Sequence, residues 1–269
     1  MKKNKKLSYF SQVKDYYKSG DKISLFIYVF LRAMVLLCMV IQFIHGNYNN
    51  VFLCILTLVL FTLPYIIDRK LNVDIPSFLE IVILLFIYSA EILGEIQNFY
   101  GIFKHWDTLL HTINGFLCAA IGFSLIDILN RSENFHMQMA PIFVSLVSFC
   151  FSMTVGVIWE FYEYASDIYF KTDMQKDRIV TSISSVKFNV DGRNVPVEMN
   201  DISETIILGT DENMVVDTGY LDIGLHDTMK DLIVNLVGAV TFSIVGLFYI
   251  KDRDGYKFAE MFIPTIKNG

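Results

Sequence analysis

Six apolar stretches, each about as long as a lipid bilayer is thick, dominate the sequence. They cover residues 23–45, 50–67, 77–94, 107–128, 140–163 and 228–250. A membrane-spanning helix needs about 20 mainly apolar residues, and only helices and closed barrels satisfy their backbone polar groups in lipid. The sequence therefore predicts an all-α polytopic membrane protein, with a six-transmembrane-helix bundle as its membrane domain at 23–250.

Lysine and arginine are unevenly distributed, and their distribution predicts the orientation. If the N-terminus is cytoplasmic, fourteen of them fall on the cytoplasmic side and six on the outer side. Cytoplasmic loops usually carry the excess. We therefore expect both termini in the cytoplasm, with a basic N-terminal segment at 1–22 and a C-terminal tail at 251–269.

One hydrophilic segment, residues 169–226, interrupts the pattern between the fifth and sixth stretches. Within it, VKFNVDGRNVPVEM alternates apolar and polar residues on both sides of Asp191-Gly192, a dipeptide typical of hairpin turns. A second pair of strands is expected in ETIILGTDENMVV, with its turn at Gly209 to Asn213. We predict a small extracytoplasmic β insertion, made of hairpins, between helices 5 and 6.

Polar side chains gather at one end of four stretches. With this orientation, the outer ends carry Glu91 and Glu95 (third), Asp107 and His111 (fourth), Glu160, Glu163 and Asp167 (fifth), and Asp227, Asp231 and Asn235 (sixth). Spacings of three or four residues keep each set on one helix face. Ionisable groups in hydrocarbon cost at least ~2.5 kcal/mol each and normally face the bundle interior. We therefore expect one shared site at the outer end.

These residue types suit a cation, because imidazole and carboxylate bind Zn²⁺ and carboxylates bind Mg²⁺ or Mn²⁺. We expect a divalent metal as cofactor, with these ligands: His111, Glu160, Asp227 and Asp231. A metal-bound water is the expected nucleophile and a Glu the base. Six residues are expected to carry catalysis: Asp107, His111, Glu160, Glu163, Asp231 and Asn235.

The alternative is that these acids only decorate the membrane interface or hydrogen-bond neighbouring helices. Asp167 and Glu95 are the members expected to be merely solvated. A separate ion pair is expected deeper in the bundle, between Arg32 of the first stretch and Glu80 of the third, with a structural role.

The order of the polar residues resembles that of a known family. Trp106-Asp107-x-x-x-His111-x-x-x-Gly115 is followed by Trp159-Glu160-x-x-Glu163 and by Asp227-x-x-x-Asp231-x-x-x-Asn235-x-x-Gly238. The series resembles YjdF-like bacterial inner-membrane proteins, which are similar in pattern to VanZ-like proteins. The resemblance covers about residues 23–250 and implies a multi-pass protein of the bacterial cytoplasmic membrane. It implies no particular reaction, and the β insertion departs from the compact loop expected in the family.

Three functions fit these features. The first is a membrane enzyme whose cation site acts on an envelope lipid or a lipid-linked precursor. The second is a cation or proton transporter, which requires ionisable groups nearer the middle of the membrane. The third is a non-catalytic membrane scaffold. Membrane lipid is the expected partner, and nucleic acid is not, because the chain has no basic stripe of the kind that binds it.

Overall fold

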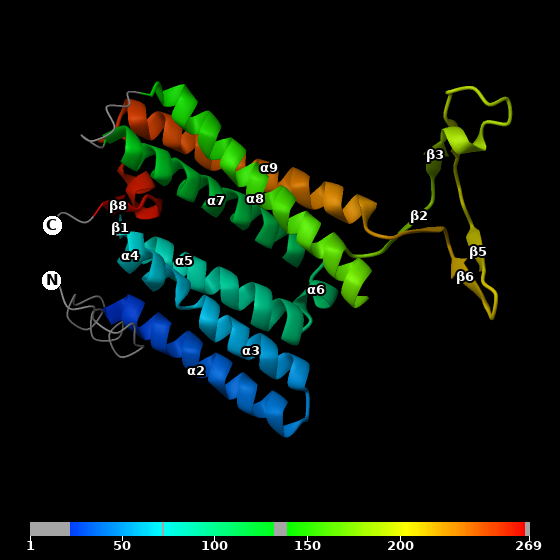
Figure 1. The fold of residues 1–269 in the computed structure, drawn as a ribbon, viewed down its shortest axis with the longest axis horizontal. Coiled ribbons are helices and arrows are strands. Elements are labelled where there is room, and N and C mark those ends of the chain that lie inside the picture. Colours follow the sequence, from blue (N-terminus) through cyan, green and yellow to red (C-terminus); the bar gives the residue numbers. More distant parts are fainter. Residues whose placement is uncertain (1–21, 72, 132–138, 267–269) are drawn as a thin grey trace. The chain divides into compact units, whose positions relative to one another are not determined.

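The computed structural model describes residues 22–71, 73–131 and 139–266, and its six long helices match the six predicted stretches (Figure 1). The spans are α2 (Lys22–Ile44), α3 (Tyr48–Leu60) with α4 (Leu63–Leu71), α5 (Ser77–Tyr88) with the π-helical η1 (Ser89–Ile96), α7 (Trp106–Arg131), α8 (Pro141–Phe170) and α9 (Leu225–Lys251). The six-helix membrane architecture is confirmed. Of the basic segment predicted at 1–22, all but Lys22 lies outside the described residues.

Two compact units make up the chain, and the division between them runs through α8 and α9. The first unit comprises Met1–Gly156 and Val234–Gly269, and the second comprises Val157–Ile233. The first of two apolar cores in the first unit is built around α2, α3 and α5. Its second core lies among α7, α8 and α9, where small residues let the helix backbones approach closely.

The second span is broken between α3 and α4 at Phe61, three residues before Pro64. Proline has no backbone N–H to continue the helix. The buried Arg32 of α2 lies at this break: its Nη2 donates to the Phe61 carbonyl at 2.9 Å, and its guanidinium stands 3.6 Å from the centre of the Tyr28 ring. Arg32 therefore satisfies a backbone oxygen inside the membrane. Its pairing with Glu80 stays a prediction.

The C-terminal segment packs into the bundle. After α9, the 3₁₀ helix η3 (Lys257–Phe262) leads to Ile263, which is 2% exposed. The Phe262 ring centre lies 5.0 Å from that of Phe116 in α7 and 5.2 Å from that of Phe78 in α5. This segment therefore completes the second apolar core.

Two further contacts fasten the same segment. β8 (Thr265–Ile266) pairs antiparallel with β1 (Val73–Asp74). Arg253 Nη2 lies 2.9 Å from Oδ1 of Asp127, a buried residue of α7. The predicted tail is thus a packed part of the first unit up to Ile266.

Truncating the buried side chain of this segment should destabilise the whole bundle. We expect Ile263→Ala to lower the free energy of unfolding by about 3 kcal/mol, because it removes buried methyl groups and leaves a cavity. Thermal unfolding in detergent measures the change. Met261→Ala is the matched control, since Met261 is 41% exposed and should cost little. Equal losses in the two variants would contradict the packed arrangement.

The second unit carries the insertion, which contains three antiparallel strand pairs. They are β2 (Arg178–Val180) with β7 (Tyr220–Asp222), β3 (Ile183–Ser185) with β4 (Val197–Met199), and β5 (Glu204–Leu208) with β6 (Asn213–Asp217). The predicted β insertion is confirmed, and so is its second hairpin. The backbone N–H of Gly209 donates to the Glu212 carbonyl at 3.1 Å and closes that turn.

The first predicted hairpin is wrong in its strands. Val186–Phe188 forms a 3₁₀ turn instead of a strand, and Ser185 Oγ accepts a backbone N–H of that turn. Asn189 Nδ2 donates to the Val195 carbonyl at 3.0 Å, so a side chain closes a wide loop between β3 and β4. Gly192, with φ of +68°, lies within this loop. Local hydrogen bonds from Ser and Asn therefore replaced the expected strand ladder.

Candidate functional site

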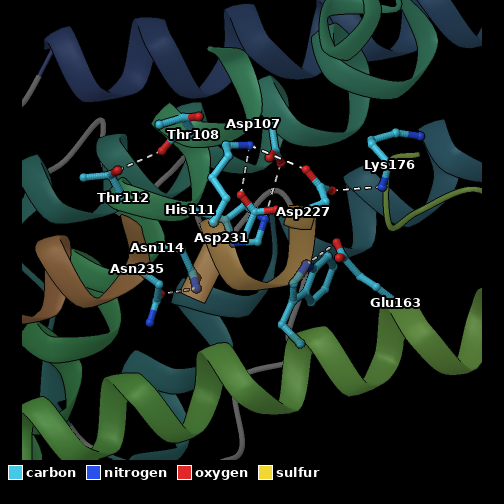
Figure 2. Close-up of polar contacts among 12 residues, drawn as sticks. Asp107, Thr108, His111, Thr112, Asn114, Glu163, Lys176, Asp227, Asp231 and Asn235 are labelled. Atoms are coloured by element: carbon cyan, nitrogen blue, oxygen red, sulfur yellow. Dashed lines mark hydrogen bonds and ion pairs between the residues drawn. The ribbon is translucent and has the colours of Figure 1, made fainter. Parts of the chain in front are cut away.

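Asp107 and His111 form a pair in the first turns of α7. Their four-residue spacing places them on one helix face, and Asp107 Oδ1 lies 3.4 Å from His111 Nε2 (Figure 2). The imidazole is largely buried. A carboxylate this close to an imidazole can orient the ring, and its oxygen and the ring nitrogen can also bind one cation together. The pair therefore has the form of an oriented metal-binding histidine.

Close packing around Asn235 fixes how α7, α8 and α9 meet. A Cβ added at Gly115 of α7 would lie 2.1 Å from the Asn235 carbonyl oxygen, and one at Gly156 of α8 would lie 2.6 Å from Asn235 Nδ2. Asn114 Nδ2 donates to Asn235 Oδ1 at 3.3 Å (Figure 2). Only glycine allows these approaches, so the three helices meet at the level of Asn235.

Serine hydroxyls extend this contact deeper into the first unit. Ser152 Oγ of α8 donates to the Gly115 carbonyl, and Ser148 Oγ donates to the Ala119 carbonyl, each at 2.7 Å. Both serines are buried. Their protons go to backbone oxygens, an arrangement typical of helix packing in membranes rather than of a proton path.

In the second unit, the last turns of α8 carry Glu160 and Glu163, both buried. Trp159 Nε1 donates to Glu163 Oε1 at 2.7 Å, a short bond of the kind that charged acceptors make (Figure 2). Glu160 lies four residues after Gly156 on the same unbroken helix, and thus one turn beyond it.

The first turns of α9 carry Asp227 and Asp231, with Lys230 beside both. Lys230 Nζ lies 3.2 Å from Asp231 Oδ1 and 3.6 Å from Asp227 Oδ1. Asp227 also accepts the Lys176 backbone N–H at 2.9 Å and lies 3.1 Å from Arg178 Nη2. Three donors already engage Asp227, so we assign it an anchoring role and leave it out of the ligand set that we propose below.

Residues 172–178, which we call the strap, tie the end of α8 to the start of α9. Asp167 of α8 accepts the backbone N–H groups of Met174 at 2.7 Å and Gln175 at 2.9 Å. Gln175 Nε2 in turn donates to Thr228 Oγ1 of α9. The expectation that Asp167 is merely solvated is therefore wrong. Its partners lie in the insertion, and the sequence did not predict the path of that segment.

One strap carboxyl group is electrostatically unfavourable in its ionised form. Desolvation, reinforced by the carboxylates of Asp173, Asp167 and Asp222, raises the pKa of Asp177. Protonated Asp177 therefore favours the folded strap. This contribution to stability is lost as the pH rises through the raised pKa.

Loss of the Asp227 carboxylate should loosen the strap. In Asp227→Asn, we expect amide hydrogen exchange across 174–180 to accelerate by about tenfold or more, because charged hydrogen bonds worth about 2 kcal/mol are weakened. Asp173→Asn is the matched control, since the Asp173 side chain is 64% exposed and pairs only with the neighbouring Lys176 in the ion pairs described. Similar exchange in both variants would argue against the anchor.

The third span contributes less than expected. Glu91 is half-buried within η1, whereas Glu95 is exposed. The Trp106 indole N–H donates to the Ser89 carbonyl, at the first residue of η1, at 3.3 Å. The π-helical turn shifts the residues that follow it to a different side of the helix. The apolar pattern of the sequence did not predict this turn.

These observations define an integral membrane protein with six spanning helices. The chain belongs to the family described as predicted membrane protein (DUF2238), whose model matches residues 26–252. It is similar to an uncharacterized protein of Thermotoga maritima, at 24% identity over 104 residues. That match covers 39% of this chain and 52% of the relative, about half of its length. No solved structure matches the chain.

Proposed function

We propose that this protein binds one divalent cation at the outer face of a bacterial cytoplasmic membrane and acts there on an envelope lipid or a lipid-linked precursor. In this proposal, Asp107, His111 and Asp231 are the ligands, and Glu160 is the base. Asp107, His111 and Asp231 combine imidazole nitrogen with carboxylate oxygen, a set that suits Zn²⁺ or Mn²⁺.

The contact of Gly115 and Gly156 with Asn235 is the observation that carries the proposal. From this contact, α7 runs without a break back to its start at Trp106, and α8 runs without a break to its end at Phe170. α9 runs without a break back to its start at Leu225. One further turn, a rise of about 6 Å, leads on each helix to an ionisable side chain. The three side chains reached are His111, Glu160 and Asp231.

Aromatic residues support a position near the membrane surface. Trp159 and Tyr162 of α8 are exposed, with ring centres 5.3 Å apart. Such residues are enriched at the level of lipid headgroups. A site at this depth is within reach of a headgroup or of a lipid-linked phosphate.

The orientation and the finer family resemblance belong to the same proposal. The lysine and arginine distribution supports cytoplasmic termini. The ordered Asp107/His111, Glu160/Glu163 and Asp231/Asn235 motifs support similarity to YjdF-like and VanZ-like proteins.

Metal analysis tests the cation site, and lipid analysis tests the reaction. Purified chain dialysed against Zn²⁺ or Mn²⁺ should retain one equivalent. Reconstituted into vesicles of bacterial lipid, the metal-loaded protein should change the lipid mass spectrum, whereas His111→Ala should not. If the protein retains the cation but changes no lipid, the enzymatic part of the proposal is wrong. If it retains no cation, the whole proposal is wrong.

A non-catalytic scaffold is the second candidate, and the Lys230 contacts favour it. The ammonium group already offsets the charge of Asp231 and Asp227 without a metal. A scaffold predicts no retained cation and a loss of stability in Lys230→Met. The enzyme proposal predicts that Lys230→Met still retains the cation.

A further inference from the structure

The β5–β6 hairpin is a two-stranded sheet (Figure 1). Apolar side chains lie on both of its faces. Ile206 and its cross-strand partner Val215 lie on one face, and each is 56% exposed. Ile207 and its partner Met214 lie on the other, at 46% and 57%. A lone hairpin is only marginally stable in water, and contiguous exposed apolar surface marks interaction sites. Burial against a partner would stabilise it.

The outer edge of β6 is open. Among the described strands, β6 pairs with β5 alone. The side of β5 is approached by β7, where Thr205 Oγ1 donates to the Gly219 carbonyl at 2.7 Å. An unpaired strand edge presents backbone donors and acceptors to any extended segment of suitable chemistry.

The charge of this surface restricts the partner. Between Arg193 and Lys230 the chain has no Lys or Arg and eight Asp or Glu residues. Four of the eight lie in the hairpin or its turn: Glu204, Asp211, Glu212 and Asp217. This charge repels an anionic lipid surface and also a second copy of the same hairpin. It attracts a basic segment.

We infer that the β5–β6 hairpin docks another protein, which adds an extended segment of alternating apolar and Lys or Arg residues along β6. The backbone of β6 supplies the ladder of hydrogen bonds, and Val215 and Met214 flank the added strand on the two faces. Asp211, in the turn before β6, and Asp217, the last residue of β6, meet the basic side chains of the added strand. The inference is independent of the cation site.

A synthetic peptide tests the surface on the full chain in lipid nanodiscs. The probe alternates Val with Lys and Thr, and its counterpart carries Glu in place of each Lys. The Lys peptide should bind saturably and weaken about tenfold or more between about 50 and about 500 mM salt, because the attraction is screened. Hydrogen exchange should slow at Met214 to Asp217. Equal binding of the two peptides, no binding, or protection elsewhere would overturn the inference.

Charge reversal on the hairpin sharpens the test. The double variant Asp211→Lys with Asp217→Lys should weaken binding of the Lys peptide by about tenfold or more, since two attractive surface charges become repulsive. Asp191→Lys, in the loop between β3 and β4, is the matched control and should bind as the wild type does. If the double variant fails to fold, the salt dependence and exchange pattern of the wild type decide. Disulfide cross-linking of Val215→Cys between copies would overturn the inference in favour of self-association.

Discussion

Replacing His111 by Ala should abolish the proposed stoichiometric binding of a divalent cation, and Asp231→Asn should weaken it by about 100-fold or more. Each variant removes one donor from a small set, and about 2.7 kcal/mol of lost binding energy corresponds to that factor. Isothermal titration of the detergent-purified chain with Mn²⁺ or Zn²⁺ measures the affinity directly. Thermal unfolding gives a second readout, because cation at 100 times its Kd stabilises the native state by about 2.7 kcal/mol.

The controls for these variants lie in the second unit, as Asp231 does. His226→Ala removes an exposed imidazole at the start of α9, and Asp217→Asn removes an exposed carboxylate of β6. Both should bind the cation and be stabilised by it as the wild type is. If His111→Ala binds as tightly as His226→Ala, the cation is held by surface groups and the proposed ligand set is wrong.

Gly115→Ala should be among the most destabilising single substitutions in the chain. Its Cβ would stand 2.1 Å from the Asn235 carbonyl oxygen, a backbone atom that cannot rotate away. α7 and α9 must therefore separate, and we expect a loss of about 3 kcal/mol from overpacking and from broken contacts. Gly156→Ala should cost less, because its Cβ meets the side-chain Nδ2 of Asn235, which can move.

Unfolding in mixed detergent measures both glycine variants. Val237→Leu is the control on α9, since Val237 is 52% exposed and added volume there meets no core atom. Gly115→Ala should also lose cation affinity, because His111 lies one turn away on the same helix. A Gly115→Ala protein as stable as Val237→Leu would show that the helices do not meet at Asn235.

The membrane spans could be predicted from the sequence, because a helix in lipid needs a long apolar run regardless of which helices pack beside it. The second strand pair followed as well, since apolar strands flank a Gly-containing turn over a short distance. The first pair did not, because Asn189 and Ser185 formed local hydrogen bonds that alternation cannot reveal. The packed C-terminal segment was also missed, since Phe262 and Ile263 look like part of a short polar tail until their partners are known.

Candidate residues could be found from sequence, but their roles could not. Helical spacing brought Asp107 to His111 and placed Asn235 on the packed face. Asp167 and Asp227 carry the same kind of carboxyl group, yet their partners are backbone and side-chain donors of the strap. Those partners depend on how the insertion returns to the helices. The lesson is that an ionisable residue next to an insertion can be an anchor as easily as a ligand.

Pulsed electron paramagnetic resonance of Mn²⁺ bound to the purified protein is the most direct measurement of the central claim, a cation held one helical turn beyond Asn235. The account predicts one tightly bound Mn²⁺ whose spectrum shows ¹⁴N coupling from imidazole, with the coupling lost in His111→Ala and retained in His226→Ala. Bound Mn²⁺ without nitrogen coupling, or coupling that persists in His111→Ala, would contradict it.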